Sequence, residues 1–124
     1  MKNKIINTAI IGCGRLTKHY FKILNSGAIE GLNIAGVCDE ISSKSDEYSK
    51  LFNCDGYTNY ETMLKKINPD LVLILTPSGF HTLHTRIALE HNANVIVEKP
   101  LSLLPTDTLS LITLAKSKNL ILEV

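Results

Sequence analysis

The feature that most constrains the fold of this chain is a regular alternation of short apolar runs with segments of helical periodicity. The runs are rich in Ile, Val and Leu, as in strands that are buried on both faces of a sheet. Between them, apolar residues recur three or four positions apart, as on one side of a helix. Strands are expected at residues 5–11, 33–38, 71–75, 95–97 and 120–124, and helices at residues 16–25, 43–52, 59–67, 80–91 and 106–118. This order predicts an α/β fold with a doubly wound parallel sheet.

Size and composition exclude several classes of protein. The 124 residues suffice for one domain, and 13 basic against 12 acidic residues argue against nucleic acid as a partner. The three cysteines lack the spacing of a disulfide framework or zinc site, which favours a cytoplasmic protein. No apolar run reaches the roughly 18 residues that a membrane helix needs. A short lipoprotein signal is an alternative explanation of the N-terminus, but Asn7 and Thr8 interrupt it and a first strand explains it better.

Chemistry-bearing motifs follow the predicted strands at their carboxyl ends, where open α/β sheets bind ligands. The turn Gly12-Cys13-Gly14 follows the first strand and opens a helix, an arrangement that offers backbone N–H groups to a phosphate. Thr17 stands where the dinucleotide fingerprint has its third glycine. We expect the backbone from Cys13 to Leu16 to hold a pyrophosphate. An ordinary tight strand–helix turn is the alternative.

Asp39 ends the second strand and is expected to bind the adenosine ribose. A carboxylate there accepts hydrogen bonds from both ribose hydroxyls and repels a 2′-phosphate. Glu40 follows it and no arginine is adjacent, which favours NAD over NADP. A helix-capping or solvated aspartate is the alternative.

The third motif, at residues 76–79, is expected to shape the cofactor cleft. Thr76-Pro77-Ser78-Gly79 ends a strand at a proline, and its glycine lets the backbone pass close to a ligand. His81 and His84 follow, and each could equally be a helix-capping or surface residue. No suitably spaced acid or cysteine joins them, so no metal site is expected.

Lys99, in Glu98-Lys99-Pro100, is the candidate catalytic residue. A partly buried lysine beside a nicotinamide could move a proton to or from a substrate hydroxyl, with Glu98 orienting it. The bond before Pro100 is a candidate cis peptide. A solvated lysine after a strand is the alternative. In all, the residues expected to bind the cofactor are Gly12, Cys13, Gly14, Arg15, Leu16, Asp39, Thr76, Pro77, Ser78, His81, Glu98, Lys99 and Pro100.

The order of these motifs resembles the Gfo/Idh/MocA family, which includes glucose–fructose oxidoreductase and inositol dehydrogenase. The resemblance covers nearly the whole chain and is carried by residues 12–19, 37–39, 60–64, 69–72, 76–81 and 97–101. It implies an N-terminal NAD(P)-binding Rossmann domain in which the residue matching Lys99 contacts substrate and assists proton transfer. The implied substrates are sugars, polyols and nucleotide sugars, and the form of residues 76–81 resembles that of members that act on nucleotide sugars.

The resemblance also implies a second, α+β domain that binds substrate, forms the homo-oligomer and supplies a further acid/base. That domain is absent from this chain. Residues 1–124 are therefore expected to be the dinucleotide-binding domain of a longer two-domain dehydrogenase, and to be inactive alone. Two alternatives stay open: a non-catalytic NAD(P)-binding sensor or interaction module, and a hydrolytic relative that uses NAD transiently.

Overall fold

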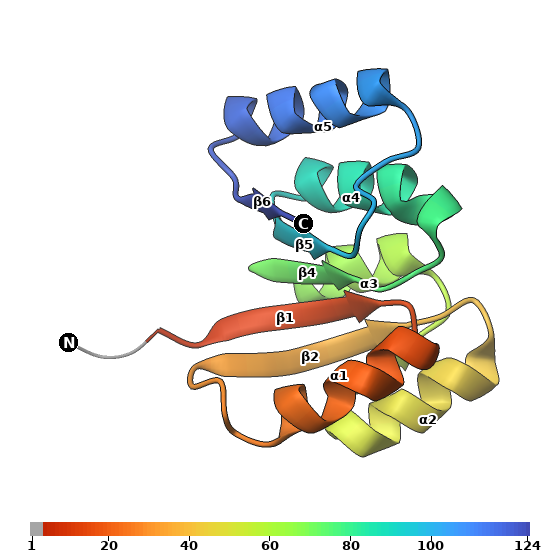
Figure 1. The fold of residues 1–124 in the computed structure, drawn as a ribbon. Helices are drawn as coiled ribbons and strands as arrows, with labels where there is room; N and C mark the ends of the chain where they lie inside the picture. The colour runs from red at the N-terminus through yellow and green to blue at the C-terminus, as the bar shows by residue number, and fades with distance from the viewer. Residues whose placement is uncertain (1–3) are drawn as a thin grey trace.

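A parallel sheet forms the centre of the molecule. In the computed structural model, which describes residues 4–124, six strands are arranged in the order β3-β2-β1-β4-β5-β6 (Figure 1). The strands are β1 (Ile6–Ile11), β2 (Leu32–Cys38), β3 (Asp55–Tyr57), β4 (Leu71–Ile74), β5 (Asn94–Val97) and β6 (Leu122–Glu123). Every neighbouring pair is parallel, so the carboxyl ends of the strands share one edge. The predicted doubly wound α/β fold is confirmed.

Helices connect the strands, and local side-chain chemistry fixes their ends. They are α1 (Arg15–Asn25), α2 (Ser42–Phe52), α3 (Tyr60–Ile67), α4 (His81–Glu90) and α5 (Pro105–Ser117), with a single 3₁₀ turn, η1 (Ser78–Phe80), before α4. Asn59 caps α3 by accepting a hydrogen bond of 2.9 Å from the backbone N–H of Thr62. Each of the helices from α2 to α5 is followed by an asparagine with positive φ, a residue that tolerates this conformation: Asn53, Asn68, Asn92 and Asn119.

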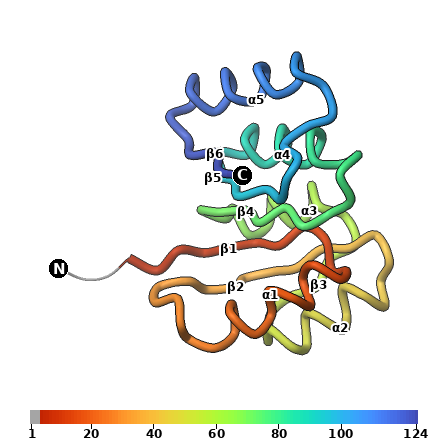
Figure 2. Tube along the Cα trace, viewed as in Figure 1, coloured from red at the N-terminus to blue at the C-terminus, as the bar shows by residue number. Residues whose placement is uncertain are grey.

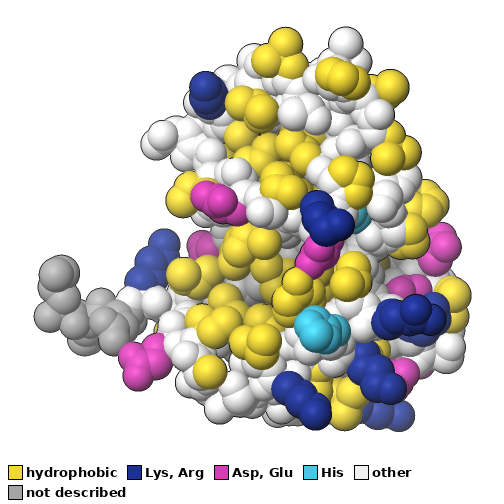
Figure 3. All heavy atoms as spheres, in the orientation of Figure 1, with side chains coloured by type: hydrophobic (Ala, Val, Ile, Leu, Met, Phe, Trp, Pro, Cys, Tyr) yellow, Lys and Arg dark blue, Asp and Glu magenta, His cyan; other side chains and the backbone are white. Residues whose placement is uncertain are grey.

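The helices cover the two faces of the sheet unequally. On one face, α1 and α2 pack against β1 and β2, where Ile10 and Val37 lie beneath Tyr48 and Phe52. On the other face, α3, α4 and α5 pack against most of the sheet's width. Within residues 4–124 no helix covers β5 on the α1 face, and Ile96 is 44% exposed there. Figure 3 shows hydrophobic side chains gathered over the middle of this face.

Strand β3 was not expected from the sequence. Its three residues, Asp55, Gly56 and Tyr57, form no apolar run, and they pair with β2 at the edge of the sheet. The chain trace in Figure 2 shows how this short strand connects α2 to α3. The other predicted elements are present, with ends shifted by a few residues. Because β3 continues the sheet, residues 58–60 lie beside the carboxyl end of β2.

The strand order reverses between β1 and β4, and this reversal positions the site. From β1 the chain moves outward to β2 and β3, and from β4 it moves the opposite way to β5 and β6. The backbone N–H of Leu75, just after β4, donates to the carbonyl of Ile11 at 2.9 Å. The loops that follow these two strands therefore diverge from adjacent points, which leaves a crevice of the kind that binds ligands in doubly wound sheets.

Candidate functional site

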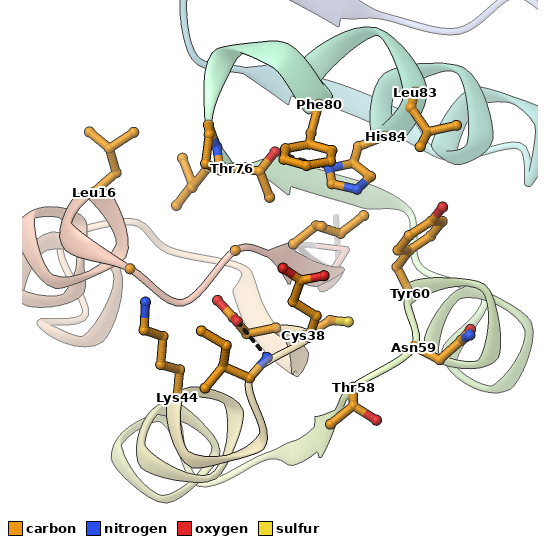
Figure 4. A pocket seen from close by; sticks show the side chains of 18 of the residues that line it. Leu16, Cys38, Lys44, Thr58, Asn59, Tyr60, Thr76, Phe80, Leu83 and His84 are labelled. Carbon is orange, nitrogen blue, oxygen red and sulfur yellow. Dashed lines mark hydrogen bonds between the residues drawn. The ribbon is translucent and has the colours of Figure 1, made fainter.

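A cleft of about 730 Å³ opens at the carboxyl ends of β1, β2 and β4 (Figure 4). Its walls come from the loops after these strands and after β3, and from the first turns of α1, α2, α3 and α4. The residues predicted to bind a cofactor that line it are Gly12, Gly14, Arg15, Leu16, Asp39, Thr76 and Pro77. Those that do not line it are Cys13, Ser78, His81, Glu98, Lys99 and Pro100.

Glycine is the only residue type that fits at position 12, where the glycine turn starts. Its φ is +104°, and a Cβ atom there would lie 2.8 Å from both the carbonyl carbon and oxygen of Leu75. Its N–H donates to the carbonyl of Cys38 at 2.8 Å. The turn is thus fastened between the ends of β2 and β4, and its close backbone approach excludes any side chain.

Gly14 leaves an open space at the N-terminus of α1. A Cβ atom on Gly14 would meet no atom within 4 Å, and no side chain caps the helix. The first N–H groups of an α-helix have no partner within the helix, and they carry the positive end of its dipole. Figure 4 shows Lys44 of α2 extending toward this turn. The arrangement suits an anion such as a phosphate.

Thr17 occupies the position of the third glycine in the dinucleotide-binding fingerprint. It lies in the first turns of α1 with no exposed surface, and its hydroxyl donates to the carbonyl of Gly12. The side chain therefore fills the contact between helix and turn and satisfies its own hydroxyl. The departure from the glycine pattern leaves the turn itself intact.

The carboxylate of Asp39 links the glycine turn to α2. One oxygen accepts a hydrogen bond of 3.0 Å from the N–H of Cys13, and the other accepts one of 2.9 Å from the N–H of Ile41. Asp39 therefore does cap the loop that leads into α2, and it lines the cleft as well. Each carboxylate oxygen has a second lone pair, so further donors can be accepted. The N–H of Cys13, however, is engaged by Asp39, so only the N–H groups at the start of α1 are left to meet an anion.

An aromatic wall forms the opposite side of the cleft. The rings of Phe80 and His84 are stacked, with centroids 5.7 Å apart, and Tyr60 meets His84 edge-on at 4.8 Å (Figure 4). The Nδ1 atom of His84 lies 3.0 Å from the hydroxyl of Thr76. Burial, with a smaller effect from the nearby His81, lowers the pKa of His84 to about 4. A neutral imidazole at physiological pH gives this wall an uncharged, flat surface.

His81 connects two loops from beneath the site. The sequence left open a capping or surface position, but the side chain is 1% exposed. One ring nitrogen lies 2.7 Å from the carbonyl of Pro100, and the other lies 2.7 Å from the carbonyl of Thr76. His81 therefore joins the loop after β4 to the loop after β5, and its side chain does not reach the cleft.

Lys99 lies outside the cleft and is exposed, contrary to the expected partial burial. The reason is the uncovered face of the sheet: Lys99 and Glu98 line a second cavity, of about 510 Å³, on the α1 side of β5. Glu98 accepts a hydrogen bond from the phenol of Tyr20 on α1. The Lys99–Pro100 peptide bond is cis, as the sequence suggested.

The thiol of Cys13 points away from the cleft. It is 2% exposed, and its Sγ lies 3.6 Å from the carbonyl of Cys38. Burial, together with the charge of Asp39, raises the pKa of Cys13 to about 12. The thiol therefore stays protonated and carries no nucleophilic chemistry at neutral pH.

Several lining residues were not expected from the sequence to bind a cofactor: Ile41, Lys44, Thr58, Asn59, Tyr60, Phe80 and Leu83. Glu40 and His84 were noted beside the motifs but not assigned to the site, and both line the cleft. Thr58, Asn59 and Tyr60 were missed because they follow β3, the strand without a sequence signal. Lys44 was missed because the charged residues around it in the sequence are typical of a solvated helix face. Helical spacing from Ile41 would have placed it on the turn of α2 nearest the cleft.

Two negative findings concern residues 4–124. No group of three or more His, Cys, Asp or Glu side chains in this part of the chain is placed to hold a metal ion. None of its helices is long and apolar enough to cross a membrane.

Comparison with known proteins gives a consistent result. The model of a family described as "Oxidoreductase family, NAD-binding Rossmann fold" (Gfo/Idh/MocA) matches residues 6–124. The dTDP-3,4-didehydro-2,6-dideoxy-alpha-D-glucose 3-reductase of Saccharopolyspora spinosa is 32% identical over 90 residues, covering 73% of this chain and 27% of the relative. The UDP-N-acetylglucosamine 3-dehydrogenase of Acidithiobacillus ferrooxidans is 28% identical over 119 residues, covering 96% of this chain and 36% of the relative.

A solved structure extends the likeness to three dimensions. The WlbA dehydrogenase from Chromobacterium violaceum, in complex with NADH and UDP-GlcNAcA, superimposes with a TM-score of 0.90 and 26% sequence identity. The match covers 98% of this chain and 34% of that one. The chain therefore spans about a third of the length of the proteins that it matches.

Proposed function

Because this chain belongs to the Gfo/Idh/MocA oxidoreductase family, whose NAD-binding Rossmann fold it has, we propose that it is the cofactor-binding domain of an NAD-dependent dehydrogenase. The parent enzyme would move a hydride between the cofactor and a carbinol carbon of a sugar, polyol or nucleotide sugar. The observation that carries the proposal is the cleft, which joins an open helix N-terminus to the carboxylate of Asp39.

The residues present fit a dinucleotide. The space beside Gly14 is where a Cβ atom would meet nothing, and the first turn of α1 offers N–H groups to a pyrophosphate. Asp39 lines the same cleft and can accept the hydroxyls of the adenosine ribose through its remaining lone pairs. The aromatic wall at Phe80 and His84 provides a flat surface for a base. When bound, the nicotinamide supplies the redox chemistry.

We expect NAD to bind more tightly than NADP. The carboxylate of Asp39 and the neighbouring Glu40 both line the cleft, so a 2′-phosphate at the ribose would face two negative charges. Lys44 lines the cleft too and offers a compensating positive charge. Because Asp39 is held by two backbone N–H groups, it has a fixed position and its repulsion should exceed this compensation.

Lys99 is proposed to handle the proton that accompanies hydride transfer. It lies two residues after the end of β5, at the same edge of the sheet as the cleft, and His81 connects its loop to the loop at Thr76. Its exposed side chain is free to meet a substrate. In the full-length enzyme, Lys99→Ala should lower turnover by about 10²- to 10⁴-fold with little change in cofactor affinity. Turnover within a factor of two of the wild type would remove Lys99 from the mechanism.

The substrate class proposed first is a nucleotide sugar. Two of the relatives are named for reactions at the 3-position of dTDP- or UDP-linked sugars, and the WlbA structure holds UDP-GlcNAcA. Assaying the full-length enzyme with UDP- and dTDP-sugars, and with free sugars and inositols as controls, tests this choice. Reduction of NAD with the free compounds alone would contradict it.

The cofactor proposal is tested by titrating the chain with NADH and NADPH in a calorimeter. NADH should bind more tightly. In Asp39→Asn, which keeps an acceptor oxygen but loses the charge, the ratio of the two affinities should fall about tenfold, the effect of roughly 1.4 kcal/mol of lost repulsion. Glu30→Gln, an exposed acid of the loop between α1 and β2, is the matched control. Failure of the wild-type chain to bind either dinucleotide would refute the proposal.

A further inference from the structure

One hydrogen bond between side chains joins α1 to the end of β5. The phenol of Tyr20 donates to Oε1 of Glu98, 78 positions later in the chain. Both residues are partly exposed, and with Lys99 they line the cavity of about 510 Å³ on the α1 face. Neither residue lines the larger cleft. The bond therefore has no part in cofactor binding as described above.

The register of the sheet explains why Glu98 faces α1. Ile96 pairs with Leu73 of β4, and Leu73 packs beneath α1. Side chains two residues apart in a strand point to the same face, so Glu98 points to the face on which Ile96 lies. The N–H of Glu98 donates to the carbonyl of Ile74 at 3.1 Å. Glu98 is thus still hydrogen-bonded to the end of β4, although β5 itself ends at Val97. The orientation of the next residue, Lys99, therefore depends on how Glu98 is fixed.

The charges of Glu98 and Lys99 give the hydrogen bond a chemical consequence. A carboxylate that lacks another partner can pair with the ammonium of the next residue. Such a pair favours the charged ammonium, which then gives up its proton less readily. The phenol of Tyr20 keeps one carboxylate oxygen engaged on the side of α1. This same hydrogen bond raises the pKa of Tyr20 above its usual value. A phenol is protonated at neutral pH in any case, so Tyr20 can donate there.

We propose that Tyr20 is a positioning residue for Lys99: by holding the Glu98 carboxylate against α1, it keeps the Lys99 amine available for proton transfer. The importance of this device for turnover rests on the proposed function, in which Lys99 moves a proton. The device itself depends only on Tyr20, Glu98 and Lys99, so it can be tested without a substrate.

The test is competitive acetylation of lysines at neutral pH, quantified for each lysine by mass spectrometry. In Tyr20→Phe, acetylation of Lys99 should slow about two- to fivefold relative to that of the exposed Lys65 of α3. The reason is that the released Glu98 carboxylate would form an exposed ion pair with the Lys99 ammonium, and exposed pairs have effects of this size. The double variant Tyr20→Phe, Glu98→Gln should restore the wild-type ratio, because the amide cannot pair with the ammonium. A purely structural role of Tyr20 would not give this reversal. An unchanged ratio in folded Tyr20→Phe would overturn the proposal.

A second measurement leaves the Tyr20 side chain in place. In protein labelled with ¹³C-tyrosine, the phenol of Tyr20 should titrate at a lower pH in Glu98→Gln than in the wild type, because the carboxylate partner is lost. An unchanged titration would show that the hydrogen bond is absent and would also overturn the proposal. If neither dinucleotide binds but both readouts respond as expected, the proposed function fails while the effect of Tyr20 on Lys99 stands.

Discussion

Gly12 and Gly14 lie two positions apart in one turn, yet substituting each by alanine should damage different properties. Gly12→Ala forces a side chain into a conformation with φ +104° and places its Cβ 2.8 Å from backbone atoms of Leu75. Gly14→Ala meets nothing within 4 Å, and its φ of −105° lies in the range that other residues adopt. The first substitution should therefore act on stability and the second on dinucleotide binding.

The magnitudes follow from these contacts. For Gly12→Ala, the left-handed conformation and a clash with backbone that cannot rotate away together cost about 2–5 kcal/mol, from ~1–2 for the backbone and ~1–3 for overpacking. For a chain of this size that lowers Tm by roughly 10 °C or more. Gly14→Ala should leave Tm within about 3 °C of the wild type, since an alanine that fits changes stability by less than 1 kcal/mol.

The binding effect of Gly14→Ala comes from the space that its methyl group would occupy. A pyrophosphate held at the start of α1 would move away from the N–H groups, and a hydrogen bond to a charged group contributes about 1.5–3 kcal/mol. Losing one such bond predicts an NADH affinity about 10- to 100-fold lower.

Thermal unfolding followed by circular dichroism, together with calorimetric titration of NADH, measures both effects on the same samples. A Gly12→Ala protein as stable as the wild type would refute the packing argument. A Gly14→Ala protein that binds NADH normally would refute the placement of the pyrophosphate.

Three further predictions concern buried groups around the cleft. His84 has a pKa of about 4 in the folded chain against 6.5 in the unfolded chain, so the unfolded chain takes up the proton first as the pH falls. The free energy of unfolding should therefore decrease by roughly 3 kcal/mol as the pH falls from 6.5 to 4. Urea unfolding at pH 7 and 4.5 measures this decrease, which should be smaller in His84→Asn than in the wild type. Cys13 and Cys38, with pKa values raised to about 12, should react with dithiobis(nitrobenzoate) at pH 8 only after denaturation, and rapid reaction of the native chain would contradict their burial. Thr17→Val keeps the shape but loses the hydroxyl bond to the Gly12 carbonyl, and should lower the free energy of unfolding by about 1–2 kcal/mol in the same urea assay.

Much of the architecture could be predicted because it depends on patterns that are local in the sequence. The apolar runs of β1, β2, β4 and β5 and the helical spacing between them lead directly to a parallel sheet with its motifs at one edge. Strand β3 could not be predicted in this way. Asp55 and Gly56 have low strand propensity, and they form a strand because Gly36 to Cys38 of β2 offer free backbone groups beside them.

The site was predicted where backbone conformation dictates the residue and was missed where tertiary contacts decide. The requirement for glycine at Gly12 is readable from its place after a strand. The position of His84 between Phe80 and Tyr60 depends on how α3 and α4 meet, which no spacing within the chain reveals. The exposure of Lys99 has a similar origin, because it reflects which face of the sheet the helices leave uncovered.

The two hydrogen bonds of Asp39 have a consequence for how such a domain can change its cofactor. The same carboxylate that would discriminate against a 2′-phosphate also anchors the N–H of Cys13 in the glycine turn and the N–H of Ile41 before α2. Relaxing discrimination by replacing Asp39 alone would therefore loosen the turn that is proposed to hold the pyrophosphate. A lineage that shifts toward NADP would first need another hydrogen-bond acceptor for the N–H of Cys13. Its cofactor preference and the hydrogen bonds that fix the glycine turn must therefore evolve together.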